Sequence, residues 1–213
     1  MSKYDELTKA QHEAIQSSEW KYIRETGETD CTTPLHEYVE AIYPGCKYVC
    51  DTPLPKDLQT KLGATKPRRF RPDLFLLDLL LDIEFDGPQH YTSLKQVLSD
   101  KQRDAWMQSL GIRTIRVPYW LQLSRANIQT WFGVDVGHPM CETTGNGLMD
   151  TNDGLHGLTI TPYAFCIAGV QRFMDELSRL PEQARQSVLD DIQQIYEANG
   201  VHHDLMDIIA RQQ

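Results

Sequence analysis

Long apolar runs are what this chain most clearly lacks. Of its 213 residues, 40% are apolar and 24% are charged, and no uninterrupted apolar run approaches the roughly 18 residues that a membrane span requires. The opening segment, MSKYDELTKAQHEAIQSS, is polar and has no apolar stretch of the kind found in secretory signals. We therefore expect a soluble intracellular protein with no membrane partner.

The sequence also lacks a regular pattern of cysteines. The five cysteines are odd in number and scattered, so reduced thiols are expected. Cys46 and Cys50 have a spacing that zinc sites sometimes use, but no second Cys or His pair follows at a matching distance. The cysteines therefore indicate neither a disulfide framework nor a structural zinc site.

An excess of positive charge is missing as well, because the net charge is -9. The acidity is confined to the C-terminal part: residues 134–213 hold 4 Lys+Arg and 12 Asp+Glu, whereas residues 1–133 hold 17 and 18. Between Lys61 and Arg125 there are 11 basic and 7 acidic residues. A local positive field over this central region is compatible with a polyanionic partner. Deletion of residues 158–213 should then raise nonspecific DNA affinity.

Isolated acids inside apolar runs are the most informative feature of the central stretch, 69–120. If 79–86 is a strand, Asp82, Glu84 and Asp86 share one face. Asp73 ends an Arg-Pro-Asp step in the preceding run, where a neighbouring strand would bring it beside Glu84. Carboxylates this close repel unless a cation lies between them, and Mg²⁺ is commonly bound by one or two carboxylates with water and phosphate oxygens. Asp73 and Glu84 are therefore the predicted metal ligands.

The order of motifs in this stretch resembles a known nuclease superfamily. A Pro-Asp, then Ile-Glu-Phe-Asp-Gly-Pro-Gln-His, an Asp-x-x-Arg helix start and Arg-Val-Pro-Tyr-Trp follow one another along the chain. Together they are similar to PD-(D/E)xK nucleases, in the branch of very-short-patch-repair and EDxHD homing endonucleases, which has relatives in phages and large DNA viruses. The resemblance covers about residues 33–120, and it would place the protein in the cytoplasm or nucleus of a host.

The resemblance implies roles for further residues. The superfamily lysine, two positions after the glutamate, is Asp86 here, and His90 resembles the histidine that serves this branch as general base or water-orienting residue. Asp100 would help to position the histidine or a metal-bound water. A glutamate on an N-terminal helix completes the site; Glu37 and Glu40 both fit, and we prefer Glu37.

Each of these residues also has a structural interpretation. Asp86 can belong to an ordinary Asp-Gly-Pro turn, and a histidine behind a turn can be structural. Asp100 can be an acid in the first turn of a helix, where the macrodipole favours it, and Glu37 a solvated helix charge. A buried Glu84 is harder to explain in this way, because a carboxylate in an apolar strand must be paired or neutralised.

Basic residues before Asp73 are candidate phosphate contacts. Lys/Arg contacts to phosphates release counterions and give sequence-independent affinity, although a solvated charge run would look the same. Arg116 lies in the last strand, where it could pair with an active-site acid or with a phosphate. The predicted nucleic-acid-binding residues are Lys66, Arg68, Arg69, Arg71, Arg103 and Arg116.

The predicted architecture is α/β, an αβββαβ restriction-endonuclease-like core with a mixed sheet and a C-terminal helical extension. Periodicity and capping signals predict helices over 7–25, 35–43, 124–131, 162–179, 181–198 and 203–211, strands over 47–54, 79–86 and 112–119, and a helix that breaks near Ser99 and ends at Gly111. The expected apolar stripes are Leu35, Val39 and Ile42 in the helix over 35–43, Leu94, Val97 and Leu98 before the break, and Ile167, Val170, Phe173, Met174 and Leu177 in the helix over 162–179. The predicted domains are the nuclease-like part (1–133), a linker (134–157) and an acidic helical extension (158–213).

The predicted function is Mg²⁺-dependent hydrolysis of DNA by an endonuclease that uses a metal-activated water, with Mn²⁺ as a substitute. The alternative is an inactive nuclease-fold protein that binds nucleic acid or a protein partner, which the missing lysine and the acidic extension favour. A homodimer would allow one site per chain to cut both strands. The C-terminal helices would serve as a lid, a dimer element or an acidic surface for a protein partner.

Overall fold

The computed structural model describes residues 7–20, 35–136, 160–200 and Asp207, without the side chains of His36 and Glu37. The chain divides into two compact units. Unit 1 contains residues 1–85 and 102–117, and unit 2 contains residues 86–101 and 118–213. The domain boundaries expected at residues 133 and 157 separate parts that would fold independently, and they stay a prediction.

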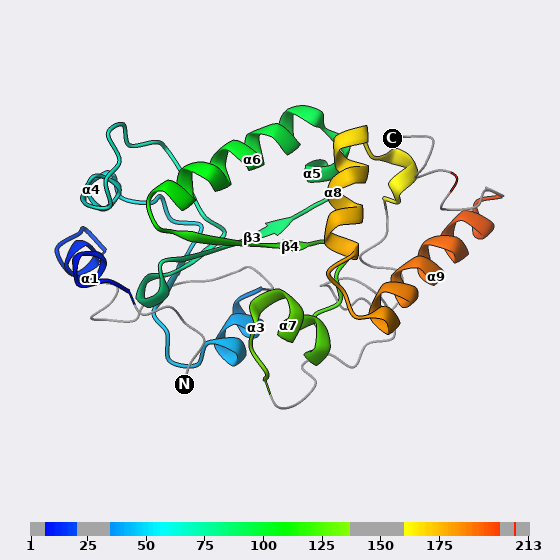
Figure 1. Cartoon of the computed structure of the whole chain (residues 1–213), viewed down its shortest axis with the longest axis horizontal. Helices are drawn as coiled ribbons and strands as arrows, with labels where there is room; N and C mark the ends of the chain where they lie inside the picture. Colours follow the sequence, from blue (N-terminus) through cyan, green and yellow to red (C-terminus); the bar gives the residue numbers. More distant parts are fainter. Residues whose placement is uncertain (1–6, 21–34, 137–159, 201–206, 208–213) are drawn as a thin grey trace. The chain divides into compact units, whose positions relative to one another are not determined.

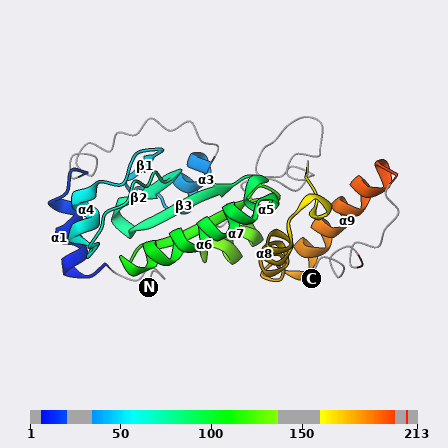
Figure 2. The ribbon, with the colours of Figure 1, turned by 90° about the horizontal axis from the view of Figure 1, so that it is seen from above.

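Four strands form one sheet in the order β1 (Tyr48–Cys50), β2 (Leu74–Leu76), β3 (Leu81–Asp86) and β4 (Arg113–Pro118). Strands β1, β2 and β3 are labelled in Figure 2, and β3 and β4 in Figure 1. Antiparallel pairing joins β1 to β2 and β2 to β3. Arg113 N donates to Leu80 O and Tyr119 N donates to Asp86 O, and both pairs are 33 residues apart (113 − 80 and 119 − 86). A constant separation means parallel pairing of β3 with β4. The predicted α/β class with a mixed sheet is therefore confirmed.

In unit 1, the core is built from apolar residues of the sheet and the N-terminal helices, including Ile15, Leu58, Phe75 and Met107. The helices are α1 (Lys9–Gln16), which lies beside α4 (Lys56–Lys61), and α3 (Leu35–Ile42) (Figure 1). The predicted stripe of α3 is confirmed, because Leu35, Val39 and Ile42 are all buried.

Two predicted elements of unit 1 are shorter than expected. Helix α1 ends at Gln16, where the hydroxyls of Ser17 and Ser18 donate to the carbonyls of Glu13 and Ile15 and so satisfy the last turn. Strand β1 ends before Asp51, whose φ of 45° is incompatible with an extended strand. Helix α4, in turn, was not predicted.

Helix α6 (Leu94–Ser109) is continuous, so the predicted break near Ser99 is wrong. Leu94 and Leu98 are 54% and 49% exposed and form no part of a buried stripe. The buried positions are instead Val97, Asp100, Met107 and Leu110, whose spacing fits one helical face. Asp100 is therefore a buried residue in mid-helix, and its expected place in the first turn of a new helix is wrong. The predicted end at Gly111 is confirmed by its φ of 70°.

In unit 2, a connected group of aromatic rings forms part of the core. Helix α8 (Ile167–Leu177) contacts the short helix α5 (Gln89–Thr92) (Figure 1). Helix α7 (Arg125–Phe132) is capped by Ser124 as predicted, and α9 (Glu182–Ala198) follows α8. The rings of Tyr91, Tyr119, Phe165, Phe173, Trp120 and Trp131 are linked by stacked or edge contacts at centroid distances of 5.0–6.4 Å.

The C-terminal predictions are confirmed in part. The segment expected to be helical over 162–179 is a single 3₁₀ turn (Pro162–Ala164) followed by α8, and α9 agrees with the helix expected over 181–198. Val170, Phe173 and Leu177 of the predicted stripe are buried, but Ile167 is 64% exposed. The third helix, 203–211, lies outside the described residues apart from Asp207.

The cysteines differ from expectation at one position. Cys46 and Cys166 are free, as predicted. Cys50 forms a disulfide whose partner lies outside the described residues, so the expectation of reduced thiols is wrong for Cys50. Among the helices described, none has both the length and the apolar character needed to cross a bilayer.

Candidate active site

Strand register places Asp73 beside Glu84 in unit 1. Leu74 of β2 pairs with Ile83 of β3, which sets the preceding residue, Asp73, opposite Glu84. The backbone N–H of Phe85 donates to Asp73 Oδ2 at 2.8 Å, and that of Asp73 donates to Glu84 Oε1 at 3.4 Å. The predicted proximity of these two acids is confirmed, and their role as metal ligands stays a prediction.

A third acid, Asp82, belongs to the same group. Its side chain is fully buried and accepts a hydrogen bond from Thr114 Oγ1 at 3.1 Å through Oδ2. Its Oδ1 is buried, and the Asp82 carboxyl shares a side-chain hydrogen bond with Glu84. The period-2 pattern had placed Asp82 on the face of Glu84, but it was not counted among the site residues.

Burial makes this group electrostatically costly. Burial raises the pKa of Glu84 to about 10, and the Asp82 and Asp73 carboxylates add to this rise, while Arg103 opposes it. Burial likewise raises the pKa of Asp82 to about 6, although Glu84, Arg103 and Thr114 lower it. A divalent cation would offset the repulsion among the three carboxylates. The donor set of Asp73, Asp82 and Glu84 therefore fits a hard metal ion.

Two arginines of unit 1 already contact acids. Arg103 Nη2 lies 2.8 Å from Glu84 Oε2, and the guanidinium lies 5.3 Å from the centre of the Phe70 ring. Arg116 holds Asp104 through two of its nitrogens at 2.8–3.1 Å. Arg103 thus belongs to the carboxylate group, and Arg116 pairs with an acid outside it. Their predicted contacts to nucleic acid remain untested.

The basic loop that precedes Asp73 is anchored by buried Gln59. The side-chain amide of Gln59 donates to the carbonyls of Leu54 and Arg68 and accepts from Arg68 N. Arg68 lies over the Trp106 ring at 5.2 Å from its centre, and Arg71 pairs with Asp51 at 3.1 Å. The four predicted phosphate contacts in this loop, Lys66, Arg68, Arg69 and Arg71, are all exposed.

Unit 2 holds a second group, which we call the His90 cluster: Asp86, His90, Asp100 and Arg172. His90 Nδ1 lies 2.6 Å from Asp100 Oδ2 and 3.2 Å from Asp86 Oδ1. All three residues are buried. Because carboxylates only accept hydrogen bonds, Nδ1 carries a proton, and in a neutral imidazole Nε2 is then the nitrogen that can accept one. This geometry suits a general base.

Arg172 is the member that the sequence interpretation missed. Its guanidinium contacts Asp86 Oδ2 and lies 3.3 Å from Asp100 Oδ2, while Nε donates to Glu176 Oε1 at 2.8 Å. Tyr91 donates its hydroxyl to the other Glu176 oxygen at 2.7 Å. No local pattern marks Arg172. The one signal was Gly169, a glycine inside an apolar helical stripe, which often has a packing reason.

The remaining candidates lie on or near α3. Glu37 lies within α3, but its side chain is outside the described residues. The alternative, Glu40, accepts a hydrogen bond from the Tyr48 hydroxyl at 2.6 Å. The predicted choice of Glu37 is therefore untested.

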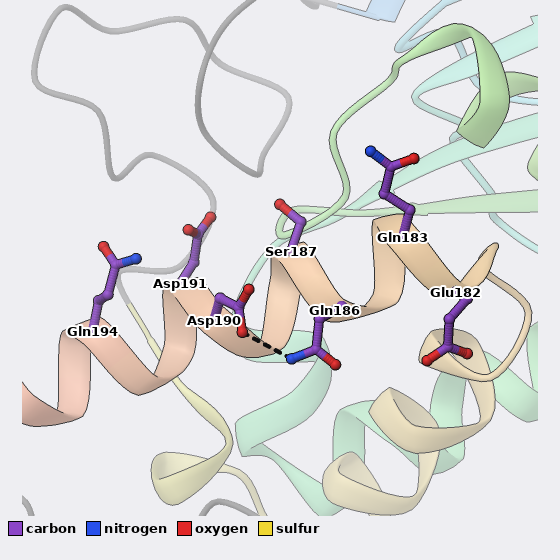
Figure 3. A pocket seen from close by; sticks show the side chains of 7 residues that line it. All are labelled: Glu182, Gln183, Gln186, Ser187, Asp190, Asp191 and Gln194. Carbon is purple, nitrogen blue, oxygen red and sulfur yellow. Dashed lines mark hydrogen bonds between the residues drawn. The ribbon is translucent and has the colours of Figure 1, made fainter.

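A hollow of about 520 Å³ lies along α9 in unit 2 and is lined by polar and acidic side chains of that helix alone (Figure 3). Gln186 donates to Asp190 across it at 2.8 Å. It contains none of the predicted site residues and is a solvated helix face.

Comparisons with known proteins identify no relative. No family model, no curated protein and no solved structure matches the chain.

Proposed function

We propose that the chain is a divalent-metal-dependent DNA endonuclease with a PD-(D/E)xK restriction-endonuclease-like core, in which Asp73 and Glu84 hold Mg²⁺ or Mn²⁺. The observation that carries this proposal is the β2–β3 register, which sets Asp73 beside Glu84. Asp82, which is buried beside Glu84, adds a third donor. Bound there, the cation would supply Lewis-acid stabilisation of phosphoryl oxygens and an activated water.

The chain's own residues have distinct parts in this proposal. Arg103, which contacts Glu84, compensates negative charge at the metal site. Lys66, Arg68 and Arg69 are exposed cations that would bind phosphates. His90 is the proposed base, because two carboxylates fix its Nδ1 proton and leave Nε2 to accept a proton from the attacking water. Asp86 and Asp100 support His90.

A second function is favoured by one specific observation. Each acid group is contacted by an arginine of the chain itself, Arg103 at Glu84 and Arg172 at Asp86 and Asp100. Internal cations of this kind stabilise buried acids without a metal. The alternative is therefore a protein that keeps the nuclease fold and binds nucleic acid or a protein partner without cleavage.

A cleavage assay separates the two functions. Supercoiled and branched DNA would be incubated with the full chain and Mg²⁺ or Mn²⁺, and then with the Asp73→Asn and Glu84→Gln variants. We expect cutting by the wild type alone, and unchanged cutting by the matched surface variant Glu13→Gln, whose acid is 65% exposed. DNA binding without metal-dependent cutting would favour the alternative. A sedimentation experiment on the wild-type chain measures its oligomeric state and so tests the proposed homodimer.

A further inference from the structure

We propose that Arg172 is a positioning residue, which holds the carboxylates of Asp86 and Asp100 against His90 and closes the His90 cluster to metal ions. Helix α8 would then supply one residue of the His90 cluster, within unit 2. The catalytic consequence rests on the proposed function, whereas the effects on His90 and on metal binding do not.

Arg172 serves as an internal counter-ion for the neighbouring carboxylates. Its side chain is 11% exposed and reaches three carboxylates, those of Asp86, Asp100 and Glu176. The guanidinium also lies 4.7 Å from the centre of the Tyr91 ring. A planar group with five donors suits this arrangement, because several acids can share it.

Charge balance explains why His90 needs this cation. The two acids at Nδ1 are buried, with 0% and 3% of Asp86 and Asp100 exposed, and two carboxylates at one imidazole repel each other. One N–H donor cannot compensate both. Without Arg172, the two carboxylates would separate or would bind a cation from solution, and the Nδ1 proton of His90 would lose its fixed acceptors.

The packing of α8 brings Arg172 into place. A Cβ at Gly169 would lie 1.8 Å from the Tyr91 carbonyl oxygen, and that same oxygen accepts a hydrogen bond from Cys166 N at 3.1 Å. The backbones of α8 and α5 therefore approach closely at Gly169. Arg172 follows three residues later, on the same face of the helix, so the close approach directs it at the acids.

The cluster has the composition of a metal site, but Arg172 occupies it. One ligand atom each from Asp86, His90 and Asp100 lies within 4.8 Å of the others, a set that transition metals accept. The guanidinium contacts both carboxylates, so a metal ion would have to displace it. Neutralising Arg172 should therefore create a cation site that the wild type lacks.

Imidazole ¹⁵N NMR of the full chain tests the positioning role. The His90 signals would be assigned by their loss in His90→Gln. In the wild type we expect a neutral His90 to carry its proton on Nδ1. Arg172→Gln should give a mixture of tautomers, and Arg172→Lys should retain the wild-type pattern. The matched control Arg185→Gln, whose side chain is 36% exposed and pairs with Glu182 on α9, should change nothing. A wild-type His90 with its proton on Nε2 would overturn the proposal, and this measurement stands even if Arg172→Gln fails to fold.

Calorimetric titration with Mn²⁺ tests the closure to metals. In a Glu84→Gln background, Arg172→Gln should bind one more Mn²⁺ than the chain with Arg172, and addition of His90→Gln should abolish that extra site. Equal stoichiometry in folded Arg172→Gln, together with an unchanged His90 tautomer, refutes the proposal.

In a cleavage assay, Arg172→Gln should lower kcat by about 10-fold or more at unchanged KM, with no further loss when His90 is already alanine. An additive loss in that double variant would contradict action through His90. If no variant and no wild type cuts DNA, the proposed function fails while the NMR and Mn²⁺ results still decide the role of Arg172.

Discussion

Replacement of Glu84 by glutamine should stabilise the metal-free protein at neutral pH. Glu84 is 4% exposed, and its pKa is raised from 4.5 to about 10, first by burial and then by Asp82. A raised acid pKa means that the folded state binds the proton more tightly than the unfolded state. The stabilisation is therefore complete below pH 4.5 and is lost as pH rises towards 10.

The magnitude follows from the same shift. Each pH unit in this window costs about 1.4 kcal/mol, so the wild type should lose up to about 3 kcal/mol of unfolding free energy between pH 4.5 and pH 7. Glutamine has nearly the same shape and no proton to exchange, so the variant escapes this loss. It does forfeit the Arg103 contact, which offsets part of the gain.

Urea denaturation with a chelator, repeated from pH 5 to pH 8, measures this difference. The wild type should lose stability steadily across the range, and Glu84→Gln should be at least as stable as the wild type at pH 7.5. Addition of Mn²⁺ at 100 times its Kd should stabilise the wild type alone, by about 2.7 kcal/mol. The exposed control Glu13→Gln should change stability by less than about 0.5 kcal/mol.

The opposite result would show that Glu84 is an ordinary buried ion pair. Removal of one partner from such a pair costs about 3–5 kcal/mol. If Glu84→Gln is destabilised by that amount at pH 7.5 while wild-type stability stays flat from pH 5 to pH 8, then Arg103 fully compensates Glu84 and the metal assignment loses its physical basis.

Three further outcomes are expected. His90→Ala should lower the cleavage rate by about 10²-fold or more and leave Mn²⁺ affinity nearly unchanged, as the loss of a general base does. If His90→Ala cuts DNA at the wild-type rate, the histidine has a structural role. Gly169→Ala should destabilise the protein by about 1–3 kcal/mol in urea denaturation through overpacking against Tyr91, whereas Gln171→Ala, at an exposed position of the same helix, should be nearly neutral. Arg68→Ala should weaken binding to any DNA sequence and reduce the salt dependence by about one ion, and an unchanged slope would remove Arg68 from the interface.

The proximity of Asp73 and Glu84 in unit 1 could be predicted because it depends on local geometry. Period-2 alternation fixes the face of Glu84, and an antiparallel partner strand only a few residues earlier brings Asp73 to it. The same reasoning failed in α6, where exposed Leu94 and Leu98 were counted as core. Buried Asp100 was then taken for a sign of a helix start, because a charged residue at a core position carries no periodic signal of its own.

Arg172 could not be predicted in this way. It lies 86 positions after Asp86, and its neighbours in the predicted stripe are the apolar residues on either side. A buried ion pair between distant segments depends on tertiary packing, here on the close approach at Gly169. Sequence periodicity reports which face of a helix is apolar, and it is silent on which charged residue at the border of that face is buried with a partner.

The acids of β3 make a consistent electrostatic pattern once their partners are known. Asp82 and Glu84 have their contacts within unit 1, to Thr114 and Arg103, whereas Asp86 receives its cation from α8. Asp86 is therefore not an unpaired charge added to an acidic strand. Deletion of residues 158–213 would remove Arg172 together with the acidic surface, so a change in DNA affinity on deletion could not be ascribed to long-range charge alone. Neutralisation of exposed acids on α9, which leaves Arg172 in place, isolates that electrostatic effect.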